Sequence, residues 1–281
     1  MATLNDILST AIQAKGLSFV LGSSPDLQGN IGGEHVYSSE QLYQILVGNT
    51  TGYTYGSNTP STNGKFTFIN EGSNGKFKAD ANNTNIIFGS GDDDKITGTT
   101  NALGQVIFGM DGNDTITGRG TGPNFLSGND GGDTITGGRG ADEIHGDQGA
   151  DKLKGGAGAD KIFGGTGNDN IDGGAGDDVI TGGPGNDRLK GGGGADTFNF
   201  SNNDGKQTDV ILDFGKGGDD KIRCTDGLKI TGHTASADGK STIVNLSDGS
   251  KIILKGVNAA KFTDHVTEVK TGTDVTGLDW G

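Results

Sequence analysis

The chain has 281 residues with a formal net charge of −14, and 56 of the residues are Gly. Apolar residues make up only 30%, which is low for a conventional globular core. The acidic balance argues against nucleic acid as a partner. The single Cys224 excludes an internal disulfide and a metal site built from several thiolates. The sequence holds no apolar run long enough for a transmembrane helix and no ordinary N-terminal signal peptide.

Residues 1–79 predict a small mixed α/β domain. A first helix is expected from Thr3, a helix-capping residue, to Gly16, and a second over residues 38–48. Residues 17–21 and 65–69 have the composition of short strands.

No catalytic motif stands in residues 1–79, so we expect no enzyme. All the tyrosines lie in this part, among Asn, Thr and Gly. Aromatic side chains in such loops can form sugar-binding platforms, and ordinary packing is the alternative interpretation.

Residues 80–136 carry a loosely spaced pattern of Gly- and Asp-rich turns followed by short apolar segments. The residue before each apolar segment alternates between an amide and an aspartate. The amides are Asn85, Gln105 and Asn124, and the aspartates are Asp94, Asp114 and Asp133. Small insertions near Gly98 and Gly118 break the spacing.

Residues 137–199 are seven consecutive nine-residue blocks that never lose phase. Gly fills positions 1 and 4, Gly or Asp position 2, Asp position 6, and a large apolar residue position 8. Gly at positions 1, 2 and 4 permits positive φ and tight turns. Backbone carbonyls can then face inward beside the aspartate. Such oxygen-only ligands suit a hard cation such as Ca²⁺.

Positions 7 to 9 alternate polar, apolar, polar, which predicts a three-residue strand with one inward side chain. Two blocks, one on each side, would make a turn of about 18 residues, with equivalent strands stacked about 4.8 Å apart. The position-8 residues would fill a thin core, and the Asp turns would form two ion-binding edges. The core residues are Ile144, Leu153, Ile162, Ile171, Ile180, Leu189 and Phe198.

Residues 200–281 predict an antiparallel β cap over the end of the repeats. Two strands are expected at 241–246 and 251–254, joined by a turn at 247–249. Asp209, Asp213 and Asp220 could hold a further ion or could simply be surface acids. The tail at 275–281 has the broad character of a C-terminal export signal.

The nonapeptides resemble the RTX, or hemolysin-type calcium-binding, repeats, whose motif GGxGxDxUx forms a parallel β-roll. The stretch after them is similar to the capping segment of RTX-containing secreted bacterial proteases and lipases. The resemblance implies a mainly β fold in three domains: a small mixed α/β domain (1–79), a right-handed parallel β-roll of nonapeptide repeats (80–199), and an antiparallel β cap with a type I secretion signal (200–281).

The expected metal ligands are the position-6 carboxylates of both parts of the repeat region, which would together hold several Ca²⁺ ions. They are Asp94, Asp114, Asp133, Asp142, Asp151, Asp160, Asp169, Asp178, Asp187 and Asp196. Within residues 80–136 the alternation predicts one acidic edge and one amide-lined edge, so calcium is expected there mainly on the acidic edge.

The resemblance implies a secreted, extracellular or cell-surface calcium-binding protein that passes through a type I ABC exporter. The chain would stay extended at low cytosolic calcium and fold outside the cell. The protein would then display residues 1–79 as a domain that binds a polysaccharide or another cell-surface ligand. Alternatives are a structural protein of the cell surface, an adhesin, or a small enzyme related to hydrolases or epimerases. RTX enzymes carry a much larger catalytic domain before their repeats, which makes the enzyme the weakest of these.

Overall fold

The computed structural model describes residues 30–31, 34–35, 66–68, 76–78, 86–89, 91–98, 100 and 104–262. The chain divides into two compact units, Met1–Ser61 and Thr62–Gly281. In the first unit, β1 (Asn30–Ile31) and β2 (Glu34–His35) form an antiparallel pair. The helices expected at 3–16 and 38–48, the strand expected at 17–21 and the tail at 275–281 lie outside the described residues.

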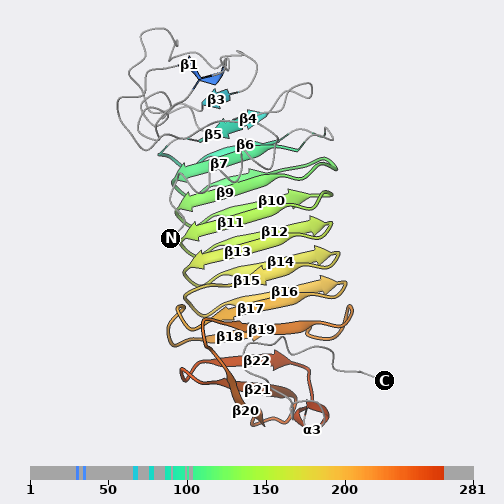
Figure 1. Cartoon of the computed structure of the whole chain (residues 1–281). Helices are drawn as coiled ribbons and strands as arrows, with labels where there is room; N and C mark the ends of the chain where they lie inside the picture. Colours follow the sequence, from blue (N-terminus) through green and yellow to red (C-terminus); the bar gives the residue numbers. More distant parts are fainter. Residues whose placement is uncertain are drawn as a thin grey trace. The chain divides into compact units, whose positions relative to one another are not determined.

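The second unit is mainly β and contains a parallel β-solenoid whose successive strands alternate between two sheets (Figure 1). Within the described residues one sheet has nine strands. They are β3 (Phe66–Phe68), β5 (Ile86–Phe88), β7 (Val106–Asp111), β9 (Phe125–Asp130), β11 (Glu143–Gln148), β13 (Lys161–Thr166), β15 (Val179–Thr181), β17 (Thr197–Ser201) and β19 (Lys221–Thr225).

The other sheet has eleven strands in the same described part of the chain. Those that belong to the parallel stack are β4 (Lys76–Lys78), β6 (Lys95–Thr97), β8 (Thr115–Thr117), β10 (Thr134–Gly138), β12 (Lys152–Ala157), β14 (Asn170–Ala175), β16 (Arg188–Gly193) and β18 (Thr208–Ile211). The remaining three are β20 (Ile230–Ala235), β21 (Ser241–Leu246) and β22 (Lys251–Lys255).

The strand register confirms the expected turn of about 18 residues. Ile144 lies opposite Ile162, and Leu153 lies opposite Ile171. In the looser part, Ile96 still pairs with Ile116, although the spacing is wider. The extra residues therefore fall in the turns, and the apolar positions keep their alignment.

The core consists of the position-8 side chains, as predicted; the two sheets contribute them alternately, and we call them the core file. All seven members from Ile144 to Phe198 are at most 2% exposed. The same file continues toward the N-terminus through buried residues of the looser repeats. These are Ile87, Ile96, Ile107, Ile116, Leu126 and Ile135.

Two features differ from the sequence-based expectation. Strands such as β12 do not stop after three residues, because Gly156 and Ala157 remain paired with Gly174 and Ala175 of the next turn. The stacked sheets also begin before residue 80, since β3 pairs with β5 and β4 pairs with β6. The strand expected at 65–69 is thus β3, and it belongs to the stack.

The repeats are followed by two more strands of the parallel stack, β18 and β19, and by an antiparallel group; β19 pairs with β17. β18 pairs with β16, and β22 pairs in parallel with β18 and antiparallel with β21. The expected turn at 247–249 joins β21 to β22, with Gly249 N–H donating to the Leu246 carbonyl at 3.1 Å. A short helix, α3 (Ala259–Phe262), follows. Among the described residues no helix is long and apolar enough to cross a membrane.

Candidate functional site

The position-6 side chains are stacked into two columns, which we call the first and the second ladder. In each ladder the Oδ1 atom of an aspartate accepts a hydrogen bond from the backbone N–H one turn earlier. Asp160 N–H, for example, donates to Asp178 Oδ1 at 2.8 Å. The bond repeats at nearly the same length, because the parallel register brings equivalent turns together.

The first ladder lies at the turns leading into the eleven-stranded sheet, and the second lies at the turns leading into the nine-stranded sheet. The first consists of Asp94, Asp114, Asp133, Asp151, Asp169, Asp187 and Asp209. The second consists of Asn124, Asp142, Asp160, Asp178, Asp196 and Asp220. All ten aspartates expected as ligands are therefore in one ladder or the other.

These ten carboxylates point into the protein. Their exposed fractions run from 0% at Asp196 to 3% at Asp94. A purely solubilising role for the acidic residues would have placed them in water, so their burial indicates a different task.

The second carboxylate oxygen, Oδ2, has no hydrogen-bond partner at eight of these rungs. They are Asp114, Asp133, Asp151, Asp160, Asp169, Asp178, Asp187 and Asp196. A buried anionic oxygen without a partner is costly unless a cation or a proton neutralises it.

A backbone carbonyl oxygen lies beside six of these Oδ2 atoms, those of Asp114, Asp133, Asp151, Asp160, Asp169 and Asp178. A Cβ atom added to Gly164 would collide with Asp169 Oδ2 of the same repeat and with the Gly182 carbonyl oxygen of the next turn. The same pair of oxygens surrounds Gly155 and Gly173. The missing side chain of the position-1 glycine thus leaves a cradle in which a carboxylate oxygen and a carbonyl oxygen converge.

The glycine positions serve two different purposes, which corrects the sequence-based expectation. From Gly149 to Gly194 the glycines at positions 2 and 4 do have positive φ, for example 106° at Gly165 and 141° at Gly167. Gly164, at position 1, does not have a positive φ. A glycine is needed there because the neighbouring oxygens leave no space for a side chain. Position 2 tolerates Asp147 at φ 74°, whereas a side chain at position 1 would fill the cradle.

Burial raises the pKa of eight of the expected ligand carboxyls. Desolvation is the largest cause, neighbouring carboxylates often add to it, and the backbone N–H on Oδ1 opposes it. The pKa rises to about 7 at Asp114, Asp151, Asp160, Asp178, Asp187 and Asp196. It rises to about 6 at Asp133 and Asp169. The metal-free ladders therefore hold protons more tightly than ordinary carboxyls do.

The donor set fits a hard divalent cation. No group of three or more His, Cys, Asp or Glu side chains converges in the part of the chain that the structure describes. Each cradle instead combines a carboxylate oxygen with backbone oxygen, which is the ligand chemistry of Ca²⁺ rather than of Zn²⁺ or copper.

The amide edge falls where the sequence predicts it. Asn124 takes the place of an aspartate in the second ladder, and both its backbone N–H and its Nδ2 donate to Asp142 Oδ1, at 2.7 and 2.9 Å. Its Nδ2 atom is also the side-chain atom nearest the cradle at Gly118, where the Gly137 carbonyl approaches as in the regular turns. Gln105 is likewise buried, and Asn85 lies outside the described residues.

Two ladder members were left open by the sequence, either as ligands of a further ion or as surface acids. Asp209 and Asp220 are buried, at 1% and 4% exposure, and they form the last rungs. They lie 22 and 24 residues after their partners instead of 18, so the nonapeptide phase does not reveal them.

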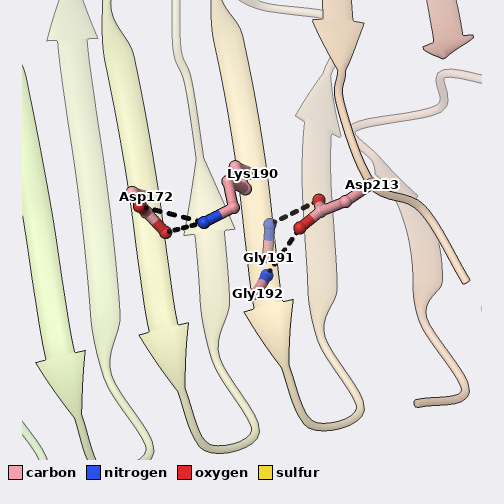
Figure 2. A network of polar contacts seen from close by, with 5 residues as sticks. All are labelled: Asp172, Lys190, Gly191, Gly192 and Asp213. Carbon is pink, nitrogen blue, oxygen red and sulfur yellow. Dashed lines mark hydrogen bonds and ion pairs between the residues drawn. The ribbon is translucent and has the colours of Figure 1, made fainter. Parts of the chain in front are cut away.

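Asp213, the third acid left open by the sequence, lies outside both ladders. Its two oxygens accept hydrogen bonds from the Gly191 and Gly192 N–H groups, each at 3.0 Å. Figure 2 shows this contact beside the surface ion pair between Lys190 and Asp172, which are 3.1 Å apart.

The cradle geometry predicts that Gly164→Ala destabilises the calcium-loaded protein by about 1–3 kcal/mol, because the new methyl group collides with two oxygens that have little room to move. Gly193→Ala is the matched control, since no atom lies within 4 Å of its Cβ position. It should change the free energy of unfolding by less than about 0.5 kcal/mol. Urea unfolding in saturating calcium measures the free energy of unfolding of both variants. Equal losses of stability would contradict the claim that Gly164 leaves space for the two oxygens.

The raised pKa values predict that the metal-free fold is favoured by acid. The unfolded carboxyls titrate near their ordinary value of 3.8 and the folded ones near 6 to 7, so their contribution is full below pH 3.8 and is lost as the pH rises through 6 to 7. Calcium-stripped protein should gain β signal in circular dichroism when the pH falls from about 8 to about 5. Asp169→Asn lacks one titrating group and should respond less. A loss of β signal on acidification would disprove the assignment.

A family model of the RTX calcium-binding nonapeptide repeat matches four times, at residues 99–120, 119–153, 145–180 and 172–204. No curated protein matches the chain. The matched residues include nine of the ten expected ligands, the exception being Asp94. They also contain the regular part of the solenoid. Residues 99–204 therefore consist of RTX-type calcium-binding nonapeptide repeats, and these repeats build the regular part of the parallel β-solenoid.

Proposed function

We propose that this RTX protein is secreted and that binding of several Ca²⁺ ions to its two ladders drives the solenoid to fold outside the cell. The expected ligands are the ten position-6 aspartates from Asp94 to Asp196 that the sequence predicts. The observation that carries the proposal is the row of buried Oδ2 atoms without hydrogen-bond partners beside inward-facing carbonyl oxygens.

Calcium would supply what the metal-free solenoid lacks. Each repeat of nine residues buries one large apolar side chain in the core file, so hydrophobic burial per ordered residue is small. Consecutive rungs also place carboxylates next to one another, as at Asp133, Asp151 and Asp169. A divalent cation would neutralise these oxygens, and its binding free energy would become folding free energy.

Such coupling suits export through a type I ABC exporter. At low cytosolic calcium the chain would remain unfolded and able to thread the exporter. Extracellular calcium modules bind in the range of about 10⁻⁴ to 10⁻³ M, so the ladders would fill after release. Residues 275–281 are our candidate for the C-terminal export signal, and the preceding part of residues 200–281 would serve as the cap.

The role of residues 1–79 follows from this arrangement as a hypothesis. We propose that this segment, apart from the strands β3 and β4 that join the stacked sheets, forms a domain that the folded solenoid displays to a polysaccharide or another cell-surface ligand. We assign no enzymatic activity to the chain.

The proposal predicts that calcium titration of the EGTA-stripped protein produces a cooperative gain of β signal in circular dichroism, because occupied turns stabilise their neighbours in the stack. Mg²⁺ at the same concentration is the control, since it prefers a tight octahedral shell with bound waters and should not replace calcium. A calcium-free protein at neutral pH that already has the full β signal would refute calcium as the folding switch.

The amide edge allows a gain-of-site test. Asn124→Asp would place a carboxylate at the cradle formed by Gly118 and the Gly137 carbonyl, so we expect the variant to bind one more Ca²⁺ ion than the parent chain. Native mass spectrometry counts the ions. Thr208→Asp, which adds the same charge at a partly exposed position outside the ladders, is the control and should leave the count unchanged. An unchanged count in Asn124→Asp would show that a carboxylate in this cradle is insufficient.

A further inference from the structure

The last rung of the first ladder differs from the eight rungs described above. Asp209 Oδ1 accepts the usual bond, from Asp187 N–H at 2.9 Å. Its Oδ2, however, is not left without a partner, because it accepts a hydrogen bond from Gln207 Nε2 at 3.0 Å. The side chain of Gln207 is itself buried, at 9% exposure for the residue.

The last rung of the second ladder shows the same property with a different donor. Asp220 Oδ1 accepts a bond from Asp196 N–H at 3.0 Å, and Asp220 Oδ2 accepts one from Gly215 N–H at 2.7 Å. At both ends, therefore, the oxygen that faces a cradle elsewhere in the ladder is bound by a protein N–H group.

Asp213 completes this end of the stack by replacing backbone carbonyls. In earlier turns of the stack, N–H groups at positions 1 and 2 donate to carbonyls of the next turn, as Gly118 does to Thr136 at 2.8 Å and Gly165 does to Gly182 at 3.0 Å. The corresponding N–H groups of Gly191 and Gly192 donate to the two oxygens of Asp213 (Figure 2).

We propose that residues 207–220 end both ladders with rungs that bind no metal, so that the columns of calcium stop before Asp209 and Asp220. This inference rests on the proposed calcium-dependent function. The side-chain amide N–H of Gln207 and the backbone N–H of Gly215 point their positive ends at the carboxylate oxygens that a cation would need. These hydrogen bonds provide the stabilisation that the cation provides at the other rungs.

The irregular spacing supplies these donors. The chain takes 22 residues from Asp187 to Asp209 and 24 from Asp196 to Asp220, compared with 18 in the regular turns. The longer connections contain Gln207 in one case and Asp213 and Gly215 in the other. A regular nonapeptide would instead present another glycine cradle, on which a further turn could stack. The departure from the repeat therefore sets where the solenoid stops.

Counting bound ions in full-length variants tests the proposal. Asp209→Asn and Asp220→Asn are compared with Asp169→Asn and Asp178→Asn, which make the same change within the same two ladders. Native mass spectrometry in saturating calcium should find fewer ions in the Asp169 and Asp178 variants. The Asp209 and Asp220 variants should keep the full count but melt at a lower temperature, because an amide cannot accept both hydrogen bonds.

The outcomes separate this inference from the proposed function. Loss of an ion in Asp209→Asn or Asp220→Asn would overturn the metal-free rungs while leaving calcium binding intact. A parent chain that binds no calcium would overturn the function itself. If either Asn variant does not fold, Gln207→Ala provides the second test, since it removes the donor and keeps the Asp209 carboxylate. Its ion count should not fall below that of the parent chain, and a fall would contradict the proposal.

Discussion

The structure depends on one recurring hydrogen bond, from the backbone N–H of one turn to the Asp Oδ1 atom of the next. At Asp160 and Asp178 this bond aligns consecutive turns and directs the second carboxylate oxygen into the protein. The same contact therefore fixes the register of the solenoid and creates the oxygen that a cation can bind. Folding and metal binding cannot be separated in such an arrangement, because each rung takes part in both.

The nine positions of the repeat divide the remaining tasks. Position 8 provides the core, positions 2 and 4 provide the left-handed turns, and the glycine at position 1 leaves room for two oxygens, as at Gly164. Protons and calcium compete for the same carboxylate oxygens, since burial raises the pKa of Asp160 and Asp178 to about 7. An acidic medium and a calcium-rich medium would therefore stabilise the turns by alternative means.

Much of this could be predicted from the sequence, because the phase of the repeat is itself geometric information. Ile162 in the core, Asp160 at an inward edge and Asn124 in a separate, amide-containing ladder all follow from counting residues. The phase could not reveal Asp209 and Asp220, which reach their rungs across longer connections. Nor could it show why Gly164 is a glycine, because the carbonyl that crowds it belongs to Gly182 in the next turn. These features depend on contacts between turns and not on the local pattern.

The most direct test of the central claim is X-ray diffraction from calcium-loaded crystals, with the anomalous signal used to locate the metal. The account predicts anomalous peaks in the glycine cradles beside Asp160 Oδ2 and Asp169 Oδ2, at the roughly 2.3–2.6 Å that calcium keeps from oxygen ligands. Cradles without a peak, with calcium bound only to exposed acids such as Asp111, would contradict it.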